Sequence, residues 1–290
     1  MSKKADDPTK QHILLTGIAF GESPRWHDNR LWFCDWLAYE IIAVDPAGNR
    51  EVVVKVPYET FPFSIDWLPD GRLIIVSSDH KQPLLRQEAN GSLVSHADLS
   101  GLKFQGWNEI AIDGRGNIYI NSAGFDLRAG EKPTPGNIDL IAADGSVRNV
   151  AGKVMFPNGM VVTTDDSTLI VAESYANKLS AFDIGADGTL SNQRVWADLG
   201  EDNPDGICLD AEGAIWYADV PHQHCTRVRE GGEILQRIDL DRGGFACALG
   251  GEDKKTLFMM TMQWGGTSSI GQGERTGQVV TARVEVPGIK

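Results

Sequence analysis

Short apolar runs, each preceded by a polar or glycine-containing turn, recur six times along the chain. The segments are HDNRLWFCDW, PDGRLIIVSSD, GRGNIYINSAG, DDSTLIVAES, AEGAIWYADV and EDKKTLFMMTM. Their first apolar residues, from Leu31 to Leu257, are spaced by 42, 45, 51, 46 and 42 positions. A repeat of this length, made of short strands and turns, is typical of β-propeller blades.

Each of these runs is followed by two more β-rich runs around a glycine-bearing turn, as in IIAVDPAGNREVVV and LSAFDIGADGTLSNQRVW. One period therefore supplies about four strands. After the sixth period, TGQVVTARVEV supplies one or two more strands, and N-terminal HILLTGIAF completes the same blade. The sequence thus predicts an all-β, six-bladed propeller with four-stranded blades, in which the two ends of the chain pair and close the ring.

The repeat runs from one end of the chain to the other and leaves no room for a second unit. We therefore expect a single domain over residues 1–290, with a flexible segment over residues 1–10. Helix should be scarce, because no long stretch has apolar residues at the 3.6-residue period of a helix.

The charge of the chain narrows its possible partners. Lys and Arg total 27 against 40 Asp and Glu, so the formal net charge is −13. This charge repels nucleic-acid phosphates and anionic membrane surfaces, which leaves a small molecule as the expected partner. The first ten residues, MSKKADDPTK, are polar with no apolar core of a signal peptide behind them, and no apolar run is long enough to span a bilayer. These features predict a soluble, cytoplasmic protein, and ring closure favours a monomer.

The cysteines show no CxxC spacing. In a reducing compartment we interpret them as buried free thiols, with a disulfide or a cysteine metal site as the alternative. They are Cys34, Cys208, Cys225 and Cys247.

Nine to eleven residues before each hairpin strand lies the start of the preceding, innermost strand of the same blade. Because the innermost strands surround the propeller axis, we expect the side chains at this position to converge. Four of the six offer carboxylate or amide oxygens. The six positions hold Glu22, Ser64, Asn108, Asn158, Asp205 and Cys247.

Two carboxylates in a narrow channel repel each other unless a cation or a proton compensates them. Together with two amide oxygens, and without His or thiolate, they suit a hard divalent cation. Calcium fits best, because it accepts oxygen ligands in loose geometry, and zinc, manganese and magnesium are alternatives. Asn158 and Asp205 each precede Gly and have a competing interpretation as turn residues, although turns need not recur at one offset in four repeats. Glu109 should point away from the cation, because adjacent strand residues face opposite sides.

The segments GESPRW, FPNGM and PDGICLD, followed by ALGGEDKKTLFMMT near the C-terminus, resemble the SMP-30/gluconolactonase/luciferin-regenerating-enzyme family in this order and spacing. The resemblance covers essentially the whole chain. It implies a six-bladed propeller with one catalytic divalent metal, usually calcium or zinc, in the central channel. By motif, it implies Glu22, Asn158 and Asp205 as metal ligands and Asn108 as a metal-proximal or substrate-binding residue.

The third repeat departs from the sugar-lactonase members of that family. Those members have the pattern R-x-N-D at the position of Asn108, and their Arg contacts sugar hydroxyls. This chain has G-W-N-E over residues 106–109. Gly106 and Glu109 replace the two charged residues, and Trp107 adds an aromatic side chain. The pattern therefore indicates the cation and the reaction type but does not indicate a sugar lactone as the substrate.

Loops at the same end of the propeller as the axis residues carry aromatic and polar side chains. Such a lining suits a flat apolar or ring-shaped ligand with a few polar anchors, and packing between blades is the alternative. The extra residues of the longest period, in NSAGFDLRAGEKPTPGN, form a candidate pocket wall or lid. For His222 and His224, hydrogen bonding within the loop is favoured over metal binding. The candidate substrate-binding residues are Trp36, Trp107, Asn108, Asp126, Tyr175, His222 and Trp264.

The function predicted from these features is a metal-dependent hydrolase of the lactonase type. Opening a lactone or related ester moves negative charge onto the carbonyl oxygen, which a divalent cation stabilises. Asp205 is predicted to be the general base, with Glu22 chiefly a ligand. The sequence has no GxSxG elbow and the axis set has no Ser/His pair, so a serine-hydrolase mechanism is not indicated. The alternative function is a non-catalytic propeller that binds calcium or a small ligand.

Overall fold

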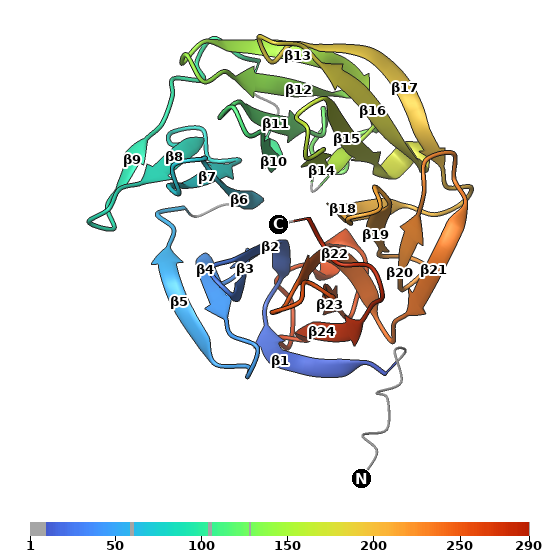
Figure 1. Ribbon diagram of the computed structural model, residues 1–290. Coiled ribbons are helices and arrows are strands. Elements are labelled where there is room, and N and C mark those ends of the chain that lie inside the picture. Colours follow the sequence, from blue (N-terminus) through green and yellow to red (C-terminus); the bar gives the residue numbers. More distant parts are fainter. Residues whose placement is uncertain (1–9, 59–60, 104–105, 128, 290) are drawn as a thin grey trace.

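The computed structural model describes residues 10–58, 61–103, 106–127 and 129–289. Its strands form six four-stranded antiparallel sheets around a central axis, which confirms the predicted six-bladed propeller (Figure 1). Helical structure in these residues is limited to the 3₁₀ turns η1 (Ser174–Ala176) and η2 (Thr267–Ser269). None of their helices has the length and apolar character needed to cross a bilayer. The segment expected to be flexible lies, apart from Lys10, outside the described residues.

The first five blades each use four consecutive strands. Blade one comprises β2 (Gly21–His27), β3 (Arg30–Asp35), β4 (Glu40–Val44) and β5 (Arg50–Lys55). Blade two comprises β6 (Phe63–Trp67), β7 (Leu73–Ser77), β8 (Leu84–Gln87) and β9 (Leu93–Ser95). Blade three comprises β10 (Trp107–Ile112), β11 (Ile118–Ser122), β12 (Gly136–Ile141) and β13 (Val147–Val154). Blade four comprises β14 (Pro157–Val162), β15 (Thr168–Glu173), β16 (Lys178–Ile184) and β17 (Leu190–Asp198). Blade five comprises β18 (Pro204–Leu209), β19 (Ile215–Asp219), β20 (His224–Val228) and β21 (Ile234–Asp239).

Blade six joins the two ends of the chain. Its inner strands are β22 (Gly243–Gly250), β23 (Thr256–Met262) and β24 (Gly277–Arg283), and its outer strand is β1 (His12–Ile18). β1 pairs antiparallel with β24, with His12 opposite Thr281 and Ile18 opposite Gly277. This pairing confirms the predicted closure of the ring.

The hydrophobic cores lie between neighbouring blades. The second strand of each blade is covered on both faces, and strands buried on both faces read as continuous apolar runs. β7, with the sequence LIIVS, is buried along its whole length. One core joins blades one and two through residues such as Ile41 and Ile65, and another joins blades five and six through Trp216 and Met259. The six apolar runs in the sequence are therefore the walls between blades.

Several inner strands bulge near their first residues. A bulge inserts an unpaired residue and re-aims the side chains beside it. The pairing shifts between Glu22 and Arg25, between Trp107 and Ile110, between Pro157 and Met160, and between Pro204 and Ile207. These are the segments that carry the predicted axis residues.

The chain returns to the axis after β24. Ala211 N donates to Pro287 O at 2.8 Å and Gly288 N donates to Lys254 O at 2.9 Å, and the C-terminal end lies at the centre of the ring in Figure 1. Gly288 and Ile289 line a cavity of about 510 Å³ with the last residues of the inner strands. The inner strands begin at the opposite end of the channel, which we call the mouth.

Candidate metal centre

The four predicted ligand residues meet at the axis. Asn108 Nδ2 donates to Asn158 Oδ1 at 3.3 Å, and the side chain of Asn158 acts to lower the pKa of Asp205. The charge of Asp205 also raises the pKa of Glu22. Each residue follows the first residue of its inner strand, and that first residue pairs with the last residue of the neighbouring strand, as Pro204 does with Asp219.

Burial and neighbouring negative charges destabilise the ionised forms of both axial carboxylates, and a bound cation would offset this cost. Burial raises the pKa of Glu22 well above its ordinary value, and the charges of Asp205 and Glu109 raise it further. Burial also raises the pKa of Asp205, as do the charges of Glu109 and Asp219. Asp205 Oδ1 is buried and has no hydrogen-bond partner. An unpartnered buried oxygen, a second carboxylate and two amides form the donor set of a hard divalent cation, so these residues fit the predicted metal.

The Asn-Gly and Asp-Gly pairs are not turns. Asn158 and Gly159 lie within β14, and Asp205 and Gly206 lie within β18. A Cβ on Gly159 would come within 2.6 Å of Ile207 N and 2.7 Å of Asp205 O. These glycines are therefore required for close approach of neighbouring inner strands, and the competing turn interpretation is wrong.

A second ring of polar residues, at the ends of the second strands, holds the mouth segments in place. Asp35 accepts from Ala19 N at 3.0 Å and Phe20 N at 2.9 Å. Glu173 Oε2 accepts from Met155 N, and Asp219 Oδ2 accepts from Asn203 N, both at 2.7 Å. These carboxylates thus position the chain just before Glu22, Asn158 and Asp205. The signal was present in the sequence as the acidic residue that ends three of the apolar runs.

Glu109 forms an ion pair with an arginine of another blade. Arg25 Nη2 lies 3.1 Å from Glu109 Oε1, and the same carboxylate accepts from Ile110 N at 2.8 Å and from Ser23 Oγ at 3.4 Å. Sequence reasoning missed Arg25, whose only signal was its place three residues after Glu22 on the same strand. Gly106 has φ of +76°, a conformation that favours glycine over the arginine of sugar-lactonase members.

The two remaining axis positions differ from each other. Ser64 Oγ donates to Asn108 O at 2.6 Å, so it holds the strand that carries one candidate ligand. Cys247 does not reach the axis, because it packs in the core between blades five and six near Cys208 and Cys225. The hairpin between β22 and β23 is about two residues longer than in most blades, because Leu257 pairs with Leu249. Phe245, two residues before Cys247, therefore takes the position that the axial residues have in the other blades. All four cysteines are free thiols, three of them buried and Cys208 half-buried.

Trp107 lies away from the channel. Its side chain is 2 % exposed in the core between blades two and three, and its Nε1 donates to Asp139 Oδ2 at 3.0 Å. Because adjacent strand residues face opposite sides, the orientation that brings Asn108 to the axis turns Trp107 into the core. The structure therefore does not place Trp107 where a ligand would contact it.

One side of the mouth is an aromatic wall between blades one and six. Phe20 lies 4.9 Å from Trp36 and 5.0 Å from Phe245 between ring centroids, and Phe245 lies 5.4 Å from Trp264. Trp36 is held in place by its Nε1, which donates to Phe63 O at 2.6 Å. Two of the predicted substrate-binding residues, Trp36 and Trp264, are thus part of this wall.

A second aromatic group lies at blade four. Tyr175 stacks on Phe156 at 4.6 Å, with Phe125 5.9 Å from Tyr175. Tyr175 is 41 % exposed, and its pKa is raised by burial and by the charge of Asp205. Asp126 is exposed, and its Oδ1 accepts from Ala129 N at 3.1 Å within its own loop.

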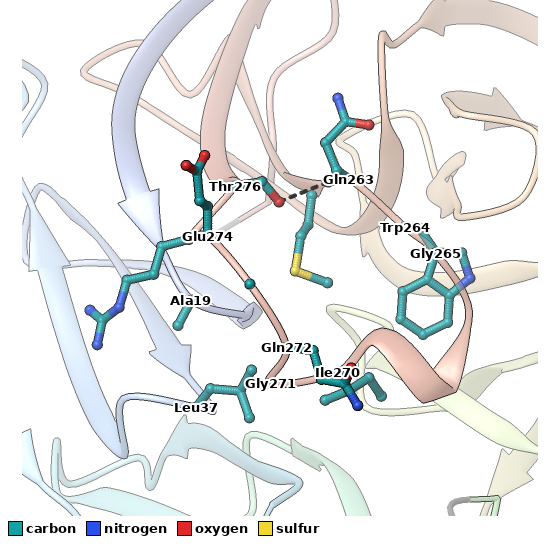
Figure 2. A pocket seen from close by; sticks show the side chains of 13 residues that line it. Ala19, Leu37, Gln263, Trp264, Gly265, Ile270, Gly271, Gln272, Glu274 and Thr276 are labelled. Carbon is teal, nitrogen blue, oxygen red and sulfur yellow. Dashed lines mark hydrogen bonds between the residues drawn. The ribbon is translucent and has the colours of Figure 1, made fainter.

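A pocket of about 610 Å³ lies beside the mouth on blade six (Figure 2). It is formed mainly by the segment between β23 and β24, where Gln263 N donates to Thr276 Oγ1 at 3.2 Å. Met262 and Trp264 belong both to the pocket and to the aromatic cluster at the mouth. None of the four axial residues lines this pocket, so it adjoins the candidate metal centre without containing it.

Four side chains gather at the mouth end of blade five, and we call them the blade-five cluster. His222 hydrogen-bonds to Asp219, which raises the pKa of His222, whereas burial lowers the pKa of His224. His222 thus makes the loop hydrogen bond expected of it. The cluster consists of Asp202, Asp219, His222 and His224.

Comparisons with known proteins agree with this architecture. A curated relative, 6-deoxy-6-sulfogluconolactonase from Pseudomonas putida, is 22% identical over 289 residues, which cover 97% of this chain and 96% of that enzyme. Diisopropyl-fluorophosphatase from Loligo vulgaris is 26% identical over 220 residues, covering 69% of this chain and 70% of that enzyme. A solved luciferin-regenerating enzyme superposes with a TM-score of 0.81 at 19% identity and covers 97% of both chains, which shows the shared fold. The family profile of the SMP-30/Gluconolactonase/LRE-like region matches residues 20–263, so the chain belongs to this family.

Proposed function

We propose that the protein is a divalent-metal-dependent hydrolase that opens a lactone or a related ester. The observation that carries this proposal is the axial set, in which two buried carboxylates meet two amides and Asp205 Oδ1 has no hydrogen-bond partner. Relatives named as a lactonase and as a fluorophosphatase support hydrolysis.

Glu22, Asn108, Asn158 and Asp205 would hold the ion, with calcium the first choice and zinc, manganese and magnesium the alternatives. When bound, a divalent cation would polarise the carbonyl oxygen of the ester and stabilise the negative charge that develops there.

Asp205 is the proposed general base. It would hold the ion through one carboxylate oxygen and take a proton from water through the other. Its buried Oδ1 has no hydrogen-bond partner and is free for one of these roles. Glu22 acts chiefly as a ligand. Ser64 and Ser174 position the site, since Ser64 Oγ donates to the backbone of Asn108 and Ser174 Oγ donates to Pro204 O at 2.7 Å.

The mouth favours a substrate with an apolar or aromatic ring. Trp36 and Trp264 offer ring faces on one side, and Tyr175 offers an exposed phenol near Asp205 on another. Gly106 cannot supply the guanidinium group that an arginine provides at this position in sugar-lactonase members. We therefore propose a lactone or ester less hydroxylated than an aldonolactone, with Asp126 and His222 as polar groups at the rim.

The test is turnover of a panel of aliphatic, aromatic and sugar lactones by the purified protein, before and after chelation. We expect chelation to abolish turnover and calcium or another divalent cation to restore it. Asp205→Asn should lower kcat by about 10²–10⁴-fold, the range for loss of a general base, without changing the circular dichroism spectrum. Asp144→Asn, an exposed carboxylate in the turn between β12 and β13, is the matched control. Full activity in Asp205→Asn would exclude the proposed role.

A non-catalytic, cation-binding propeller is the second candidate, because the axial donor set needs no base in order to bind calcium. In that case no lactone in the panel turns over, and chelation only lowers the melting temperature. We also propose a cytoplasmic protein, because four free thiols suit a reducing compartment. A monomer that acts on a small molecule is proposed because β1 and β24 close the ring. Light scattering after size exclusion measures the oligomeric state.

A further inference from the structure

The blade-five cluster brings two imidazoles and two carboxylates together. His224 Nε2 lies 3.4 Å from Asp202 Oδ2 and 3.9 Å from Asp219 Oδ2. His222 Nδ1 lies 3.1 Å from Asp219 Oδ2 and 3.8 Å from Asp202 Oδ1. All four ligand atoms lie within 4.8 Å of one another.

His224 is the residue that ordinary packing does not explain. Its side chain is 0 % exposed, and its Nε2 has no hydrogen-bond partner although it faces two carboxylates. Its other ring nitrogen, Nδ1, lies 2.9 Å from Thr226 Oγ1. When Nδ1 donates to that hydroxyl, Nε2 presents a bare lone pair to Asp202 and Asp219, an arrangement that costs free energy unless a cation lies between them.

The corresponding residues of blade four show how a buried carboxylate at this position is otherwise neutralised. Glu173 ends β15 as Asp219 ends β19, and Glu173 pairs with Lys178 as Asp219 pairs with His224. Lys178 Nζ lies 3.4 Å from Glu173 Oε1 and supplies a positive charge. Blade five has a buried imidazole there and a further carboxylate from Asp202. The charge of Arg237 acts on both histidines, but its guanidinium pairs with Asp239 at 3.2 Å rather than with Asp202 or Asp219.

We propose that the blade-five cluster is a second metal site, specific for zinc or a similar borderline divalent ion and separate from the axial centre. Two nitrogens and two carboxylate oxygens form a typical donor set for tetrahedral zinc. Bonds of about 2.0–2.1 Å put tetrahedral ligand atoms about 3.3–3.4 Å apart, and the observed separations lie on both sides of this value. The axial set has no imidazole and suits a harder ion.

Outer contacts already orient the ligands. Tyr217 Oη donates to Asp202 Oδ2 at 2.6 Å, and Asn203 N donates to Asp219 Oδ2 at 2.7 Å. Such contacts fix the direction of metal ligands in known sites. Asp202 and Asn203 lie directly before the strand that carries Asp205, so an ion in the cluster would anchor that segment.

The experiment is zinc binding to the full-length protein, with zinc alone as the ligand, measured by equilibrium dialysis and elemental analysis. We expect the double variant Glu22→Gln/Asp205→Asn to keep one zinc per chain. His224→Gln should weaken that binding by at least about 100-fold. His222→Gln, with a side chain 39 % exposed, tests the same site without disturbing the core. His12→Gln, an exposed histidine on β1, is the control and should bind as the parent does.

Cobalt in place of zinc gives an independent reading, because a four-coordinate cobalt site absorbs strongly in the visible range. The band should persist in the axial double variant and disappear in both cluster variants. Loss of zinc in the axial variant with retention in His222→Gln and His224→Gln would overturn the proposal, since zinc would then occupy the axis. Failure of the parent protein to bind zinc or cobalt would overturn it as well. Neither result bears on whether the axial centre hydrolyses a lactone.

Discussion

Among single residues, Arg25 and Glu109 place opposite charges inside the channel wall, beside the two axial carboxylates. Their side chains are 19 % and 7 % exposed, so their attraction is only weakly screened by water. Without Arg25, Glu109 would be a third uncompensated carboxylate next to Glu22 and Asp205. The pair therefore sets how much negative charge the axis carries.

Removing one partner of this pair should cost more than removing both. We expect Arg25→Met to lower the free energy of unfolding by about 3–5 kcal/mol, because it leaves a buried charge unpaired. Arg25→Met/Glu109→Gln should lower it by clearly less. Urea unfolding of the two single variants and the double variant closes a double-mutant cycle, and additive effects would contradict the pairing.

The residue-level predictions succeeded where one strand alone fixes the geometry. Glu22, Asn108, Asn158 and Asp205 each lie second in an inner strand, because each precedes a hairpin of similar length. Their role as metal ligands stays a prediction. Arg25 could not be predicted, since its role depends on a contact with another blade. The partners of His224 were missed for a similar reason, because Asp202 reaches it from the segment between β17 and β18.

At the level of elements, the inner strands approach so closely that glycine is needed beside two of the axial residues. Gly206 is the tighter case, because a Cβ there would lie 2.4 Å from Ala246 Cβ and 2.7 Å from Ala246 Cα. The contact joins β18 to β22 and so relates Asp205 to the aromatic side of the mouth.

Gly206→Ala should therefore destabilise the protein by about 1–3 kcal/mol, the usual cost of overpacking. Activity should also fall, because the shift moves the strand that carries Asp205. Gly101→Ala is the matched control, since a Cβ at Gly101 meets nothing within 4 Å. Thermal melts and kcat compare the two variants. Equal stability would show that the strands can separate without cost.

The sequence predicted which elements form but not every register. Polar turns and apolar runs fix a strand by themselves, so the blades were predicted from the repeat. The length of the last hairpin is not encoded in that pattern, and the constant offset therefore pointed to Cys247 instead of Phe245. Likewise the bulges at the start of the inner strands, which decide where neighbouring side chains point, leave no periodic signal.

For the whole molecule, the axial carboxylates couple stability to pH and to the bound ion. Because burial raises their pKa values in the folded state, they bind protons more tightly there than in the unfolded chain. Their contribution to stability is complete below their ordinary pKa of about 4 and is lost as the pH rises through the raised values.

A cation that replaces these protons should stabilise the protein more at about pH 8 than at about pH 5. At a concentration about 100 times its Kd it adds about 2.7 kcal/mol, or a rise of roughly 4 °C in Tm for a chain of this size. Differential scanning fluorimetry with calcium or chelator at both pH values measures the difference. A calcium effect of the same size at both would argue against binding at Glu22 and Asp205.

The pairing of β1 with β24 also constrains how the protein is made. β1 is translated before the strands of the other five blades, yet its partner lies between Gly277 and Arg283. Those blades can form as they emerge, whereas β1 must wait with an unpaired edge until β24 has been translated. Closure of the propeller therefore follows synthesis of the other five blades, and the unclosed ring is the state in which the nascent chain most needs protection from aggregation.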